Sequence, residues 1–151
     1  MDDTTYRREA VRLSAVIVLA TGCLLLWASL LTFDPADWPS PKVTPHNDPP
    51  YNAAGAVGAF IAYHAFYWLG EGAYSVALFL AVAVFVLLAH GRLSDLWLRI
   101  IGLGLVVAVT SATVRLVAPG GPDSLPEGNG GILGIAIASC QTRHFSMLGT
   151  G

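Results

Sequence analysis

The sequence has little charge and almost no lysine. Charged residues make up 12% of its 151 residues and hydrophobic residues 54%, and the mean hydropathy is +0.61. A soluble domain of this length would carry roughly twice that charged fraction. The net charge is −2 and the one lysine is Lys42, so nothing indicates a basic surface for nucleic acid. The composition is that of an integral membrane protein.

Residues that carry chemistry are also scarce. The two cysteines, Cys23 and Cys140, are not spaced as a metal site. A disulfide between them is a weak alternative, because Cys23 lies in an apolar run. The sequence contains no nucleotide-binding P-loop, no zinc-protease motif and no serine-hydrolase elbow, and its apolar runs lack acidic residues. We therefore expect no catalytic, cofactor-binding or metal-binding residues.

The most informative stretch runs from Gly55 to Ala89. Its second part, 73–89, is an uncharged run of seventeen residues, which at about 1.5 Å per residue covers most of a hydrocarbon core of about 30 Å. Its first part, 55–69, is rich in Tyr, Trp and Phe, which favour the membrane–water interface. Gly70-Glu71-Gly72 separates the two parts. The pattern predicts an interfacial helix, a glycine corner and then a membrane span.

The same pattern begins again near the end. Gly55-Ala56-Val57-Gly58 aligns with Gly131-Ile132-Leu133-Gly134, and a second corner is expected at Gly149-Thr150-Gly151. The second interfacial helix is placed at about 131–148. We therefore predict an all-α membrane protein: a helical bundle of two repeated span–loop–interfacial helix–span units, the second truncated before its last span.

The rest of the chain supplies two more spans and two loops. Residues 1–12 are polar and are expected to form a separate N-terminal segment. The following run, 13–33, is too long for a signal peptide and predicts an uncleaved span. A third span is expected at about 96–118. The stretches 34–51 and 119–130 are proline-rich loops, since proline excludes regular helix.

Arginine positions predict the orientation. Most arginines precede the first span or lie between the second and third, whereas the two proline loops hold Lys42 and five acidic residues. The positive-inside rule then places the N-terminus in the cytoplasm and both proline loops outside.

Two charged residues near the spans have several interpretations. Arg115 interrupts the third apolar run near its outer end, where it could reach the headgroups, pair with Glu71 or serve transport. The first of these is favoured. Glu71 stands at the expected start of a helix, where a carboxylate interacts favourably with the helix dipole, and capping is favoured over proton chemistry.

Three strings, in order, resemble a known family. They are LLTFDPAD at residues 30–37, GAVGAFIA at 55–62 followed by Leu69-Gly70, and GGILG at 130–134. Together they resemble the N-terminal four-transmembrane domain of FtsK/SpoIIIE-type bacterial DNA translocases, over about residues 13–151. The structural candidates from the strings, corners and charges are Phe33, Asp34, Pro35, Gly55, Gly58, Gly70, Glu71, Gly72, Arg115, Gly131 and Gly134.

The resemblance implies a function for the chain. It implies a multi-pass anchor in the bacterial inner membrane that holds an ATP-driven motor at the division septum, with the lipid bilayer, septum proteins and copies of itself as partners. The chain has three predicted spans, without the fourth span or the motor domain, so no direct binding of ATP or nucleic acid is expected. A small transporter or channel subunit is the alternative, suggested by the repeat.

Overall fold

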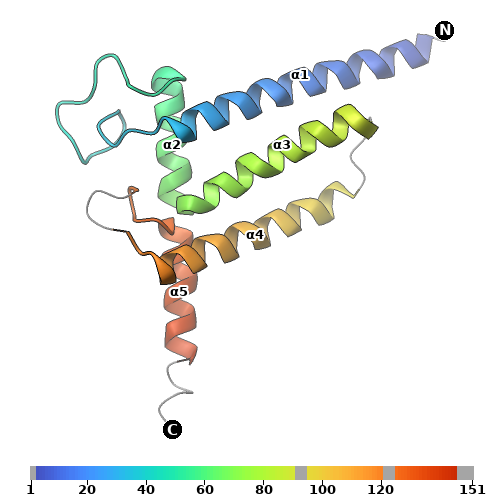
Figure 1. Ribbon diagram of the computed structural model, residues 1–151. Coiled ribbons are helices and arrows are strands. Elements are labelled where there is room, and N and C mark those ends of the chain that lie inside the picture. Colours follow the sequence, from blue (N-terminus) through green and yellow to red (C-terminus); the bar gives the residue numbers. More distant parts are fainter. Residues whose placement is uncertain (1–2, 91–94, 121–124, 146–151) are drawn as a thin grey trace.

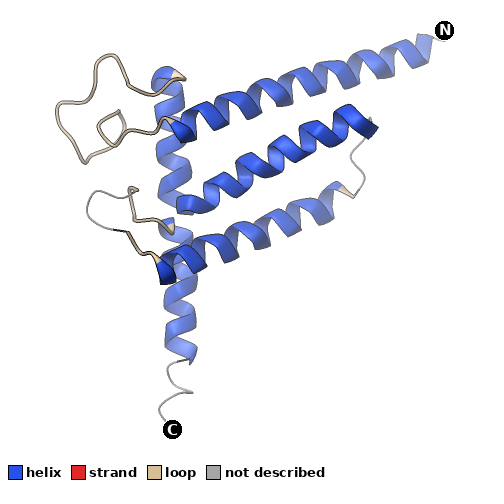
Figure 2. Cartoon of the chain, viewed as in Figure 1, coloured by secondary structure: helices blue, strands red, loops and turns tan. Residues whose placement is uncertain are grey.

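The computed structural model describes residues 3–90, 95–120 and 125–145. These residues form five α-helices and one short 3-10 helix, so the predicted all-α class is confirmed (Figure 2). The elements are α1 (Asp3–Leu31), α2 (Gly55–Leu69), η1 (Gly70–Gly72), α3 (Ala73–His90), α4 (Leu96–Val117) and α5 (Gly131–Phe145).

The helices form two sets with different directions. In Figure 1, α1, α3 and α4 lie side by side, and α3 packs against both of the others. Helices α2 and α5 run across one end of this layer, follow one another in line, and contact each other. Helix α2 packs on the end of α1, and α5 packs on the end of α4. One end of the layer is thus covered by two crossing helices.

Three segments are long and apolar enough to cross a membrane. They are Glu9–Leu31, Gly55–His90 and Leu96–Val117, and no more than 22% of any of these windows is buried by protein. The second segment includes α2, and because the chain turns at η1, only α3 lies alongside the other two spans (Figure 1). The largely uncovered apolar side chains need an apolar surrounding, which a bilayer provides.

Proline and glycine set the helix ends. Helix α1 stops at Leu31, shortly before Asp34-Pro35, because a proline cannot continue the hydrogen-bond ladder. Helix α4 stops at Val117, and Ala118, directly before Pro119, has left the helical conformation. Helix α2 ends at Gly70, whose φ of 58° is unfavourable for other residues.

A small core lies where α1, α2 and α3 meet. Its buried residues are Leu30, Ala62, Phe66, Ala73 and Ala77, with Trp27, Phe33 and Tyr74 packed around them. Alanines let the helices approach closely, and Phe66 fills the remaining space. This core fixes α2 against the ends of the two spans that it connects.

The first helix begins before the predicted first span. Helix α1 begins at Asp3, so the polar residues 3–12 before the predicted first span are helical as well, consistent with their lack of glycine and proline. The predicted second corner at 149–151 and the last residues of the 131–148 helix lie outside the described residues, as do residues 91–94 between the second and third spans and 121–124 of the second loop.

Candidate functional site at the glycine corner

The corner at η1 lies directly against the start of α5. Gly70 and Gly131 both have positive φ, 58° and 61°. A Cβ built on Gly70 would lie 2.1 Å from the Asn129 carbonyl oxygen, and one on Gly131 would lie 2.4 Å from the Gly70 nitrogen. The Glu71 N–H donates to the Asn129 carbonyl at 2.7 Å. Any other residue at either position would have an unfavourable positive φ, and its Cβ would overlap the backbone of the other segment.

Ser111 of α4 joins three elements at this corner. Its side chain is fully buried, and its hydroxyl donates a 2.7 Å hydrogen bond to the Leu69 carbonyl at the end of α2. A Cβ on Gly72 would lie 2.3 Å from the Ser111 Oγ, and one on Gly134 would lie 2.4 Å from the Ser111 carbonyl oxygen. The two glycines thus let η1 and α5 close on Ser111 from different sides.

A similar crossing occurs where α2 meets α1. A Cβ on Gly58 would lie 2.8 Å from the Ser29 Oγ and 2.2 Å from the Asn52 Oδ1. The buried Asn52 amide donates to the carbonyl of Ser29, in the last turn of α1, at 2.9 Å and to that of Thr32, directly after the helix, at 3.3 Å. Gly55 opens α2 with a φ of 66°. Asn52 therefore satisfies carbonyls that the helix itself leaves unpaired.

The first proline loop is organised around Asp37. Its carboxylate is 2% exposed and accepts three hydrogen bonds, from the Asn47 side-chain amide at 2.8 Å and from the Tyr51 and Asn52 N–H groups, both at 2.9 Å. A buried charge requires such partners. Asp37 thus ties the two ends of a proline-rich loop together.

The other residues of the 30–37 string lie around this loop. Phe33 packs edge-on against Phe66, with ring centroids 5.1 Å apart. The Asp34 carboxylate accepts the Ala36 N–H at 2.7 Å, which forms a local turn. Pro35 lines an open cavity beside the glycine corner.

Glu71 and Arg115 do not pair with each other. Glu71 lines the same cavity as Pro35, and its carboxylate has no hydrogen-bond or ion-pair partner within the described residues. Arg115 donates to the Pro119 carbonyl at 3.4 Å, four residues further on. The guanidinium therefore lies at the second loop, beside Gly128. An ion pair between Arg115 and Glu71, one of the sequence alternatives, is not formed.

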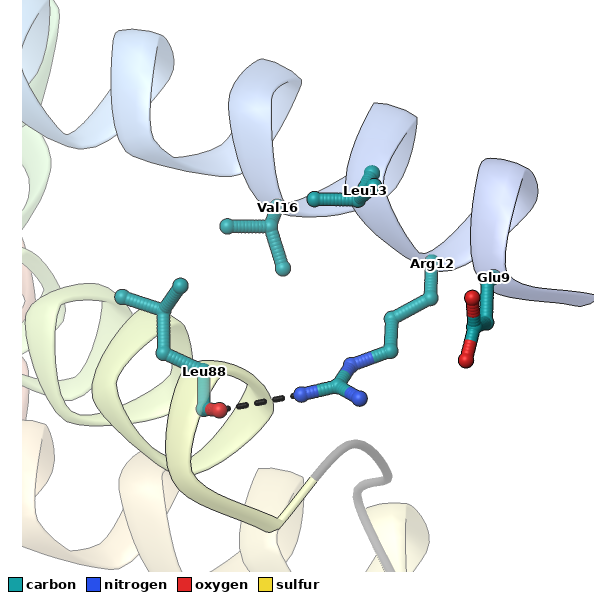
Figure 3. Close-up of a pocket in the computed structure, with 5 residues that line it drawn as sticks. All are labelled: Glu9, Arg12, Leu13, Val16 and Leu88. Carbon is teal, nitrogen blue, oxygen red and sulfur yellow. Dashed lines mark hydrogen bonds between the residues drawn. The ribbon is translucent and has the colours of Figure 1, made fainter.

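An arginine clamp holds the opposite end of the layer. The Arg12 guanidinium of α1 donates to the carbonyls of Leu87 at 3.1 Å and Leu88 at 2.9 Å, in the last turns of α3. Figure 3 shows it reaching across a hollow of about 200 Å³ between α1 and α3. A cation at a helix C-terminus satisfies free carbonyls and interacts favourably with the helix dipole.

The sequence as a whole matches one family. A profile of the 4TM region of DNA translocase FtsK/SpoIIIE matches residues 8–151. The chain belongs to this family. FtsK/SpoIIIE membership also explains why the three strings occur in this order and why the chain has several spans. It identifies the chain as the membrane region of an FtsK DNA translocase.

Two curated relatives agree with the FtsK/SpoIIIE profile. The chain is 32% identical to the DNA translocase FtsK of Pseudomonas putida over 142 residues, which is 90% of this chain and 17% of the relative. It is 36% identical to the DNA translocase FtsK of Pseudomonas aeruginosa over 109 residues, which is 67% of this chain and 13% of the relative. The chain thus spans less than a fifth of either relative. No solved structure matches it significantly.

Several residues that hold the helices and the first loop together were not among the sequence candidates. They are Arg12, Ser29, Asp37, Asn52 and Ser111. Asp37 closes the 30–37 string, so the resemblance contained a signal for it. Ser29 and Ser111 are polar residues in apolar runs, which often mark helix contacts.

Proposed function

We propose that this chain is the membrane anchor region of an FtsK-like DNA translocase that acts in cell division and chromosome segregation. It would act by insertion into the inner membrane and by contacts with septum proteins and with copies of itself. The family match supports the translocase context and favours it over a transporter or channel subunit. The alternative has no specific observation in its favour.

The observation that carries the proposal is the difference between the two ends of the layer. Both proline loops and both crossing helices meet at one end, whereas Arg12 clamps the other. The positive-inside rule supports a cytoplasmic N-terminus and external loops. In that orientation α2 and α5 lie at the outer face, where their surface and the Asp37-centred loop are presented to proteins of the septum.

We also propose that the chain contains two related units. Gly55 and Gly131 open α2 and α5 with similar φ values of 66° and 61°. Gly58 and Gly134, three residues later in each helix, pack on Ser29 of α1 and Ser111 of α4. This correspondence supports a repeat of span, loop and interfacial helix. The repeat would place the two loops on the same side.

Labelling of single cysteines tests the orientation. Two single-cysteine variants are made after Cys23 and Cys140 have been replaced by serine. One carries Val43→Cys in the first loop, and the other carries Tyr6→Cys in α1. Both native side chains are exposed, at 41% and 64%. A membrane-impermeant maleimide is expected to label Val43→Cys in intact spheroplasts and Tyr6→Cys only after lysis. The reverse pattern would refute the orientation.

Microscopy tests the anchoring role. A fluorescent protein fused to the N-terminus of the chain is expected to concentrate at the division site of dividing cells. A second variant, Ser111→Leu, should abolish this enrichment while the protein remains in the membrane, because leucine cannot fit between Gly72 and Gly134. Uniform distribution of the unaltered chain around the cell would count against septal contacts.

A further inference from the structure

An open cavity of about 360 Å³ lies where the two loops meet the glycine corner. Its walls come from the residues that directly follow α1, from the continuous stretch α2–η1–α3, and from the second loop. A volume in this range accommodates a small ligand or a headgroup. The cavity is thus formed by three stretches that are far apart in the sequence, residues 33–35, 66–74 and 125–129.

One wall of the cavity is aromatic. Phe33, Phe66 and Tyr74 line it, with ring centroids 5.1 Å apart between the two phenylalanines and 5.6 Å apart between Phe66 and Tyr74. Pro35 and Leu125 extend the apolar surface. Such a wall attracts alkyl groups, and ring faces also attract cations.

The polar groups that line the cavity can bind a cation. Glu71 is the one carboxylate among the described lining residues, and the other polar groups there are the Asn129 side chain and the Tyr74 hydroxyl. The Glu71 carboxylate has no hydrogen-bond or ion-pair partner within the described residues. A plain acyl chain in this space would desolvate that carboxylate without compensation, which is unfavourable. A ligand with an ammonium group would pair with it.

The cavity also lies at the level of lipid headgroups. Phe33 follows the end of α1 by two residues, and Tyr74 is in the first turn of α3, so both stand where a span leaves the hydrocarbon core. At its rim, Lys42 of the first loop donates from Nζ to the Leu125 carbonyl at 3.3 Å. A positive charge thus stands near one side of the cavity and a negative charge lines it. This arrangement is complementary to a zwitterionic headgroup.

We propose that this cavity binds the headgroup of an ethanolamine phospholipid. The ammonium donates to the Glu71 carboxylate and the Asn129 side chain, the ethylene group lies against Phe66 and Tyr74, and the phosphate faces Lys42. A primary ammonium has three N–H donors, whereas the quaternary ammonium of choline has none. A glycerol headgroup lacks the cation altogether. The site does not depend on the division role, so either proposal can fail alone.

Lipid retention measures this preference. The full chain is reconstituted in micelles that contain equimolar dioleoyl phosphatidylethanolamine, phosphatidylcholine and phosphatidylglycerol, and native mass spectrometry identifies the retained lipid. We expect ethanolamine lipid to be enriched, and Glu71→Gln to lower its retention about tenfold, because a charge-assisted hydrogen bond is lost. Glu127→Gln is the matched control, since Glu127 is exposed on the neighbouring loop and does not line the cavity. The control should retain lipid as the unaltered chain does.

A zero-length cross-linker identifies the source of the ammonium in membranes. Carbodiimide activation of Glu71 in native vesicles is expected to give an amide to the lipid amine, detected as a mass increase on the peptide that contains Glu71. Coupling to a lysine of another protein instead would overturn the lipid assignment. Equal retention of choline and ethanolamine lipids, or unchanged retention in Glu71→Gln, would also overturn it.

Discussion

Gly70 and Gly131 lie so close that each backbone occupies the space of the other's side chain. A Cβ on Gly70 would lie 2.5 Å from the Gly131 nitrogen, and one on Gly131 would lie 2.4 Å from the Gly70 nitrogen. The two residues are 61 positions apart, and each begins a new helical element. This contact joins the two halves of the described chain where both change direction.

The first prediction concerns this contact. Gly131→Ala should destabilise the protein by roughly 1–3 kcal/mol or more, because the alanine meets backbone atoms that cannot rotate away and keeps an unfavourable positive φ. Thermal unfolding in detergent, followed by circular dichroism, measures the effect. Gly102→Ala is the control, because Gly102 lies within α4 and a Cβ there meets nothing within 4 Å. Equal melting temperatures of the two variants would show that the contact is unimportant.

The second prediction concerns the hydrogen bond of Ser111. Ser111→Ala leaves the Leu69 carbonyl without its 2.7 Å donor. The expected loss is about 0.6 kcal/mol, the average for hydrogen bonds between membrane helices, and at most about 1.7 kcal/mol. Thr113→Val removes a hydroxyl from an exposed position of the same helix and should change stability little. Chemical unfolding in mixed micelles compares the two, and a larger effect for Thr113→Val would contradict the assignment.

The third prediction concerns the loop that Asp37 organises. Both carboxylate oxygens of Asp37 accept hydrogen bonds. In Asp37→Asn one of these oxygens becomes an NH₂ group, which would face an N–H donor. The substitution should therefore destabilise the folded loop by roughly 1–3 kcal/mol. Limited proteolysis of the membrane-embedded protein should then cut within residues 38–51 more rapidly. Asp48→Asn is a suitable control, since Asp48 is exposed. Unchanged proteolysis of Asp37→Asn would mean that prolines alone hold the loop.

The fourth prediction concerns the arginine clamp at the other end. Arg12→Gln removes the charge that binds the Leu87 and Leu88 carbonyls. Amide hydrogen exchange in the last turn of α3 should become roughly two- to fivefold faster, since a cation at a helix C-terminus contributes about 0.3–1 kcal/mol. Arg7→Gln, at an exposed position nearer the N-terminus, should leave that exchange unchanged.

Much of the fold could be predicted from the sequence. The apolar runs indicated three spans because a membrane leaves few alternatives to long helices. The glycines at 70–72 indicated a break because glycine permits a backbone that other residues avoid. The packing partners could not be predicted. Ser111 and Leu69 are 42 residues apart, and no periodicity in an almost wholly apolar helix shows which side faces a neighbour. The cavity beside Glu71 depends on three distant stretches of the chain meeting at one place.

The in-line arrangement of α2 and α5 gives the two faces of the molecule unequal widths. One face carries two helices laid across the span ends, and the described residues at the other face are the span ends themselves (Figure 1). In a bilayer that the three spans cross, each copy would occupy a larger area in one leaflet than in the other. Neighbouring copies that touch through α2 and α5 leave gaps between their spans, which lipid must fill. Copies whose spans touch instead must tilt away from one another, and a row of them would curve the bilayer.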